Sequence, residues 1–203
     1  NKILTLYKQK KFHDVISAGQ KIYNSNFNDI QLIYLLGLAS INIQDFTQGE
    51  KYFLKLVSIK ESAESYYTLG NIQKKLNKLK DAVISFENAI KYNPNFSEAY
   101  NNLGNTKKLI GLRDEAIINY KKAISLKENN IEALISLSAI LKENKNFEDL
   151  VKIYQKILVL DKNNIKTLYN LGSAYLFLGN FNKGKSYFEK VINIDSSHIP
   201  SFR

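Results

Sequence analysis

The sequence of 203 residues contains no cysteine, methionine or tryptophan, and only two prolines and two histidines. Without cysteine there is no disulfide framework, thiolate zinc site, iron–sulfur cluster or cysteine nucleophile. His13 and His198 lie near opposite ends of the chain, so we expect no metal site and no cofactor. No apolar run reaches the length of a signal peptide or membrane span. We expect no membrane partner and a cytoplasmic location.

Arginine is scarce as well. Arg113 and Arg203 are two of 29 basic residues, and the formal net charge is +10. Proteins that read bases favour arginine, because its planar fork pairs with guanine. The lysines form no run longer than two, so there is no basic arm. Lysine, asparagine and isoleucine share A/T-rich codons, which accounts for the positive charge without a nucleic-acid partner. We therefore expect none.

Motifs that carry catalysis are missing too. The sequence has no GxGxxG, P-loop, HExxH, GxSxG or EF-hand loop. Neighbouring acids such as Asp114-Glu115 stand where helices are predicted to begin, and there they interact favourably with the helix dipole. At 44% hydrophobic residues the chain is able to bury a sizeable core. We predict a folded protein that is not an enzyme.

Self-similarity with a period of 34 residues runs through most of the chain. Leucine recurs in one column, glycine or serine follows it, and three further columns hold aromatic, small or aliphatic residues. The columns are Leu69, Leu103, Leu137 and Leu171; Gly70, Gly104, Ser138 and Gly172; Phe86, Tyr120, Tyr154 and Phe188; Ala82, Ala116, Leu150 and Gly184; and Ala89, Ala123, Ile157 and Val191. Such a period indicates a repeat architecture.

Each copy predicts two helices. Residues 100–107 place apolar or small side chains on one helical face, and residues 116–124 repeat that pattern. Gly111 between them is free to take a positive φ and close the turn. Gly104 is predicted to pack beside the ring of Tyr120, so that a larger residue there would overpack the helix crossing.

This pattern resembles the tetratricopeptide repeat (TPR). The matching residues are Tyr66, Leu69, Gly70, Ala82, Phe86, Ala89 and Pro94 in one copy, and Tyr100, Leu103, Gly104, Gly111, Ala116, Tyr120 and Ala123 in the next. The resemblance implies an all-α fold, a right-handed α-solenoid of helix-turn-helix repeats whose first helices line a concave groove. A pentatricopeptide array has similar repeats but lacks the Leu-Gly and Ala-aromatic-Ala pattern.

We predict a single array over residues 1–203, and we interpret the chain as a segment of a longer protein. The copy at 131–164 departs most from the family pattern, but its Leu137 and Tyr154 keep the register. The predicted divisions are a partial repeat at 1–29, full repeats at 30–62, 63–96, 97–130, 131–164 and 165–198, and the start of a further repeat at 199–203.

The resemblance also implies which residues face the groove, namely those beside the Leu-Gly pair. An asparagine there offers one acceptor and two donors, which suits the C=O and N–H of a peptide. The candidate peptide-binding residues are Tyr67, Asn71, Lys74, Asn101, Asn102, Asn105, Lys108, Tyr169, Asn170 and Ser173. The alternative is that these amides are simply solvated, since asparagine is abundant throughout the chain.

Residues Glu98 to Asn105 are similar to the TPR region of O-linked N-acetylglucosamine transferase, whose family holds substrate peptides on an asparagine ladder. Asn102 and Asn170 match ladder positions, whereas Thr68 and Ser136 depart from them. The carboxylate clamp of chaperone-binding TPR adaptors is not expected. Tyr67, Glu132 and Ser136 stand where that clamp needs cations.

The leading hypothesis is therefore a non-catalytic protein–protein interaction scaffold that binds an extended peptide or a partner helix in the groove. The alternative is the TPR substrate-recruiting arm of a larger glycosyltransferase or sulfotransferase. A protein or peptide partner is expected in either case. Self-association through exposed end repeats is a further expectation, because the end of a repeat array presents apolar surface.

Overall fold

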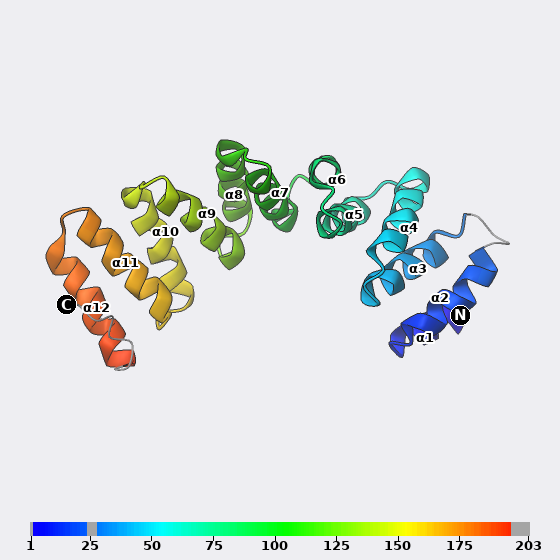
Figure 1. Cartoon of the computed structure of the whole chain (residues 1–203), viewed down its shortest axis with the longest axis horizontal. Coiled ribbons are helices and arrows are strands. Elements are labelled where there is room, and N and C mark those ends of the chain that lie inside the picture. The colour runs from blue at the N-terminus through cyan, green and yellow to red at the C-terminus, as the bar shows by residue number, and fades with distance from the viewer. Residues whose placement is uncertain (1, 24–27, 196–203) are drawn as a thin grey trace. The chain divides into compact units, whose positions relative to one another are not determined.

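The computed structural model describes residues 2–23 and 28–195, and these residues form α-helices joined by short turns, with no strand among them (Figure 1). The predicted all-α solenoid of helix-turn-helix pairs is confirmed. His198 and the predicted start of a further repeat at 199–203 lie outside the described residues. The helices are α1 (Lys2–Lys8), α2 (Phe12–Tyr23), α3 (Ile30–Asn42), α4 (Phe46–Ile59), α5 (Ala63–Lys75), α6 (Leu79–Tyr92), α7 (Ser97–Leu109), α8 (Arg113–Leu126), α9 (Ile131–Glu143), α10 (Phe147–Leu160), α11 (Ile165–Phe177) and α12 (Phe181–Ile194).

The chain divides between Ala116 and Ile117 into two compact units. Unit 1 contains α1 to α7 and the start of α8, and unit 2 contains the rest of α8 and α9 to α12. Within unit 1, α3 packs on α4, α4 on α5, α5 on α6 and α6 on α7. Within unit 2, α9 packs on α10, α10 on α11 and α11 on α12. Each of these helices thus packs mainly against its neighbours in sequence, as expected for a repeat array.

The turn inside each helix pair holds one residue in the left-handed backbone region. These residues recur every 33 or 34 positions, in the pairs of both units. They are Lys10 (φ 58°), Gln44 (φ 64°), Asn77 (φ 58°), Gly111 (φ 86°), Lys145 (φ 54°) and Gly179 (φ 74°). The positive φ predicted for Gly111 is confirmed. Only two of the six are glycine and one is asparagine, which tolerates this region. The turn therefore also imposes the conformation on lysine and glutamine residues that disfavour it.

Asparagine has a structural use that its abundance alone did not reveal. Each helix from α9 to α12 begins after an asparagine whose side chain accepts a hydrogen bond from a backbone N–H in the first turn. Asparagine is among the preferred residues for this role. The four caps are Asn130 to Ala133 at 3.0 Å, Asn146 to Asp149 at 3.2 Å, Asn164 to Thr167 at 2.9 Å and Asn180 to Lys183 at 3.3 Å.

The repeat position that usually holds glycine packs against the repeat position that holds an aromatic residue. A Cβ at Gly70 would lie 2.7 Å from the ring of Phe86, and a Cβ at Gly172 would lie 2.9 Å from the ring of Phe188. The Phe86 ring is fully buried. These positions have no room for a side chain, which supports the packing role predicted for the column. In α9 the column holds Ser138, whose hydroxyl donates to the carbonyl oxygen of Ile135 at 2.8 Å.

Candidate functional site

Three of the predicted site residues meet through hydrogen bonds in unit 1. Tyr67 and Asn71 lie one turn apart on α5, and Asn102 lies on α7. The Asn102 Nδ2 donates to the hydroxyl oxygen of Tyr67 at 3.1 Å and to Asn71 Oδ1 at 2.8 Å. All three side chains are half-buried. We call Tyr67, Asn71 and Asn102 the α5–α7 amide cluster.

Aromatic packing fixes the tyrosine of this cluster. The Tyr67 ring lies 4.7 Å from the ring of Phe96 and 6.0 Å from that of Phe86, between ring centroids. It also packs against a buried core that includes Leu103. Because the ring is held on several sides, its hydroxyl oxygen is placed to accept a hydrogen bond from the Asn102 side-chain amide. This hydrogen bond links α5 to α7 at their surface.

The cluster leaves one donor group and one acceptor atom unused. Both Nδ2 protons of Asn102 are engaged, and so is the Oδ1 of Asn71. Among the described residues, none hydrogen-bonds to the Asn71 Nδ2 or the Asn102 Oδ1. Two adjacent amides therefore present an N–H donor and a C=O acceptor, which is the pair that a peptide backbone requires.

Other predicted residues on these helices differ in exposure. Lys74, Asn105 and Lys108 are half-buried on α5 and α7. Asn101 is only 2% exposed, so its side chain is covered in this structure. Consecutive helical residues point about 100° apart, and this rotation separates Asn101 from its neighbour Asn102. The TPR resemblance had placed both residues among those that face the groove.

The remaining predicted residues, Tyr169, Asn170 and Ser173, belong to α11 in unit 2. The Ser173 hydroxyl donates to the carbonyl oxygen of Tyr169 at 3.0 Å, which is a bond within its own helix. The Tyr169 ring lies 5.4 Å from the ring of Phe188. Tyr169, Ser173 and Phe188 line a hollow of about 330 Å³ together with Leu176 and Phe177. This surface is more apolar than the amide cluster.

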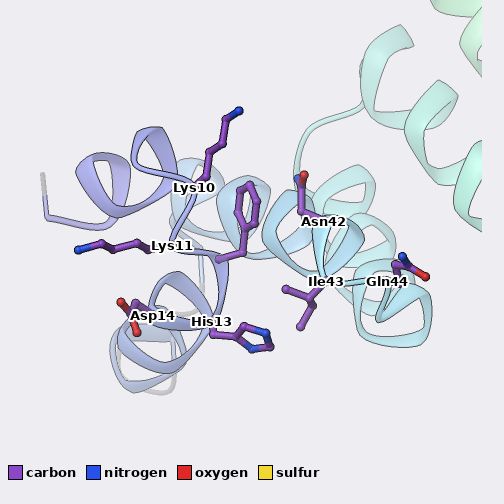
Figure 2. Close-up of a pocket in the computed structure, with 8 residues that line it drawn as sticks. Lys10, Lys11, His13, Asp14, Asn42, Ile43 and Gln44 are labelled. Carbon is purple, nitrogen blue, oxygen red and sulfur yellow. The ribbon is translucent and has the colours of Figure 1, made fainter.

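A larger hollow of about 480 Å³ in unit 1 lies beside the turns that follow α1 and α3 (Figure 2). It is lined by Lys10, Lys11, Phe12, His13, Asp14, Asn42, Ile43 and Gln44. Figure 2 shows the Lys10 and Lys11 ammonium groups pointing in different directions. Because the charges diverge, this hollow presents no converging set of groups for an anion.

One polar cluster escaped the sequence analysis. Glu61, just before α5, accepts hydrogen bonds from the hydroxyls of Tyr66 at 2.7 Å and of Tyr92. The hydrogen bond from Tyr92, followed by that from Tyr66, holds the pKa of the Glu61 carboxyl below its ordinary value. Burial and the bond to Glu61 raise the pKa of Tyr66 to about 12. Tyr66 and Tyr92 stack with their centroids 5.7 Å apart. Tyr66 was identified only as a residue that matches the TPR pattern, and Tyr92 lies 31 residues after Glu61. No sequence signal therefore indicated that these three side chains would meet.

No helix among the described residues is both long enough and apolar enough to cross a bilayer. Within the same residues, no group of histidine, cysteine, aspartate or glutamate is arranged to hold a metal ion.

Sequence models of the tetratricopeptide repeat family match most of the chain. One matches residues 30–62, 97–130 and 165–198, and a second matches residues 63–96. The chain therefore belongs to the tetratricopeptide repeat family. Residues 131–164, between two of these segments, form the pair α9–α10. No curated protein matches the chain significantly.

Several solved structures share the fold. A crystal structure of MamA has a TM-score of 0.59 at 22% identity, covering 95% of this chain and 94% of MamA. YrrB, described as a TPR protein with an unusual peptide-binding site, has a TM-score of 0.72 at 20% identity, covering 89% of this chain and 94% of YrrB. The C-terminal part of a TPR protein from Cytophaga hutchinsonii has a TM-score of 0.84 at 16% identity, covering 96% of this chain and 78% of that one. These likenesses establish the fold, whereas the similarity to the transferase TPR region stays a prediction.

Proposed function

We propose that the chain is a non-catalytic protein-interaction scaffold that binds an extended peptide through the peptide backbone, at the α5–α7 amide cluster. The observation that carries this proposal is the hydrogen bonding of Asn102 to Tyr67 and Asn71. It orients two amides so that the Asn71 Nδ2 and the Asn102 Oδ1 stay available to a ligand. A peptide C=O accepts from the first, and a peptide N–H donates to the second.

Two further observations support a backbone grip. The cluster is pre-organised, because the Tyr67 ring is packed against Phe86 and Phe96 before any ligand arrives, and pre-organised groups lose less entropy on binding. Lys74 and Lys108 lie in the last turns of α5 and α7. Their charge favours peptides with a carboxylate near that end of the two helices.

An array of immobilised peptides with varied sequences tests the proposal. The protein is expected to capture peptides of unrelated sequence, and N-methylation of one or two backbone nitrogens should abolish capture. Changing Asn71 and Asn102 to alanine together should weaken binding by roughly tenfold or more, because each net hydrogen bond is worth about 1 kcal/mol.

The matched control is Asn163→Ala, which removes an exposed asparagine from the turn between α10 and α11. It should bind as the wild type does. Circular dichroism establishes that the double variant is folded. Capture that survives both alanines, or that tolerates N-methylation at every position, would refute the backbone grip and move the binding site elsewhere on the array.

A further inference from the structure

The clefts between successive second helices follow one pattern. Each repeat has a first and a second helix, and each cleft lies between the second helices of two successive repeats. One residue from each of these two helices forms a wall of the cleft. A residue from the first helix that lies between them in the sequence forms the floor. The three positions recur every 34 residues. They hold Glu87, Lys107 and Glu115 in the first cleft, Lys121, Leu141 and Asp149 in the second, and Gln155, Tyr175 and Lys183 in the third.

In the first and third clefts, a long floor side chain is held by both walls. Lys107 Nζ lies 3.1 Å from Glu87 Oε1 and 2.8 Å from Glu115 Oε2, and the Lys107 side chain is only 12% exposed. In the third cleft, Gln155 Nε2 donates to the Tyr175 hydroxyl oxygen at 3.1 Å, and the Lys183 ammonium lies 5.3 Å from the Tyr175 ring centroid. A polar-tipped side chain therefore occupies each of these clefts.

The second cleft, between α8 and α10 in unit 2, has no such side chain. Its floor residue is Leu141, which is shorter and has no polar tip for the walls to hold. A pocket of about 480 Å³ lies here. Ile124, Leu137, Leu141 and Ile153 form its apolar lining, and each of them is at most 9% exposed.

Lysines surround the opening of this pocket. Lys121, Lys152 and Lys156 line it together with Asp149 and Glu128. Lys152 forms an ion pair with Asp149 at 2.9 Å, which neutralises that carboxylate. No described residue forms an ion pair with Lys121 or Lys156. Besides the hydrogen bond from Lys152, the charge of Lys121 also helps to lower the pKa of Asp149, without an ion-pair contact. An apolar interior therefore opens between two lysines that hold no ion pair with a described residue and are able to pair with an anion.

We propose that this pocket binds a small organic anion with an apolar body, of the class of medium-chain carboxylates. The pocket volume falls within the roughly 300–1,000 Å³ of small-molecule sites. The buried aliphatic side chains accept the chain of the ligand, and Lys121 and Lys156 pair with its carboxylate. Leu141 is the specificity-determining residue, because it leaves open the space that Lys107 and Tyr175 fill in the other two clefts.

The test is an NMR titration of the protein with octanoate, using octylammonium as a probe of equal chain length and opposite charge. Octanoate should shift the methyl signals of Leu141 and Ile153 to saturation, and octylammonium should bind at least several-fold more weakly. Lys121→Gln and Lys156→Gln should each weaken octanoate binding about two- to fivefold, which is the effect of one solvent-exposed ion pair.

Two matched variants separate the pocket from general surface binding. The pair Leu141→Lys with Lys121→Glu rebuilds the Glu-Lys-acid arrangement of the first cleft, so it should keep the fold and abolish binding. The reverse pair, Lys107→Leu with Glu87→Lys, should open the first cleft and add a second octanoate site.

Three results would overturn the proposal. They are equal binding of both probes, octanoate binding that persists in the closed variant, and no saturable shift with octanoate. If an acidic helical peptide saturates the pocket while octanoate does not, the site belongs to a protein partner and the assignment of a small ligand is wrong.

Discussion

The helix pairs α5–α6 and α9–α10 share a scaffold and differ at equivalent positions. In both pairs a left-handed residue closes the turn, and an aromatic residue of the second helix is buried. On the surface, α5 carries Tyr67 and Asn71 where α9 carries Ile135 and Ala139. The difference teaches that core positions are constrained by the space between helices, whereas surface positions are free to vary from one pair to the next.

The largest expected effect on stability comes from exchanging glycine and serine at the repeat position that holds Gly70 in α5 and Ser138 in α9. Gly70→Ser gives α5 the residue that α9 already has in Ser138. The new Cβ would meet three atoms of the buried Phe86 ring within 3.0 Å, so we expect a loss of about 2 kcal/mol in the free energy of unfolding. Ser138→Gly should cost only about 0.5 kcal/mol, from helix propensity. Urea unfolding of both variants measures the contrast, and equal effects would contradict it.

The next largest effect is expected at the residue that precedes the second helix of each pair. Asn146 caps α10, whereas Lys78 makes no cap and pairs with Glu50 at 2.5 Å. The Glu50 side chain is only 8% exposed. Lys78→Asn would introduce a capping side chain but would leave Glu50 without its partner. We therefore expect it to lower the free energy of unfolding by about 1–2 kcal/mol. The cost stays below that of a fully buried ion pair, because Lys78 is half-exposed.

Asn146→Ala is the companion variant and should cost about 1 kcal/mol through the lost cap. Thermal melting of both variants tests the comparison. A Lys78→Asn protein as stable as the wild type would show that water reaches the Glu50 carboxylate.

Replacing a left-handed turn residue by glycine is expected to raise stability. Lys145 adopts φ 54° and Asn77 adopts φ 58°. Lysine is unfavourable in this region, while asparagine tolerates it and glycine has no penalty. Lys145→Gly should raise the free energy of unfolding by about 0.5–1 kcal/mol, and Asn77→Gly should leave it nearly unchanged. Destabilisation by Lys145→Gly would indicate that the lysine side chain contributes packing.

The smallest expected effect depends on pH. Hydrogen bonds from Tyr92 and Tyr66 depress the pKa of Glu61 below its ordinary value of 4.5. A depressed folded-state pKa means that the stabilisation is present at neutral pH and is lost as the pH falls through the folded pKa. The α9–α10 pair has Asn129 and Leu160 at the positions of Glu61 and Tyr92. Glu61→Gln should flatten the acid side of a melting-temperature profile, and an unchanged slope would contradict the assignment.

The TPR resemblance, and not the period alone, implied that residues beside the Leu-Gly pairs face the groove. Three of those residues, Tyr67, Asn71 and Asn102, are joined by hydrogen bonds in the structure. The burial of Asn101 was not predictable, because it depends on how neighbouring helices cover that face. The division into repeats and the peptide-binding role of the ten residues stay predictions.

The sequence by itself determined the helix pairs, the turn glycine at Gly111 and the small-beside-aromatic packing, because each follows from periodicity and side-chain volume within one repeat. Only the tertiary structure decided which polar groups meet. The Lys107 contacts with Glu87 and Glu115 and the open cleft above Leu141 depend on side chains from three different helices. Contacts of this kind are set by the spacing between helices, which no single helical pattern encodes.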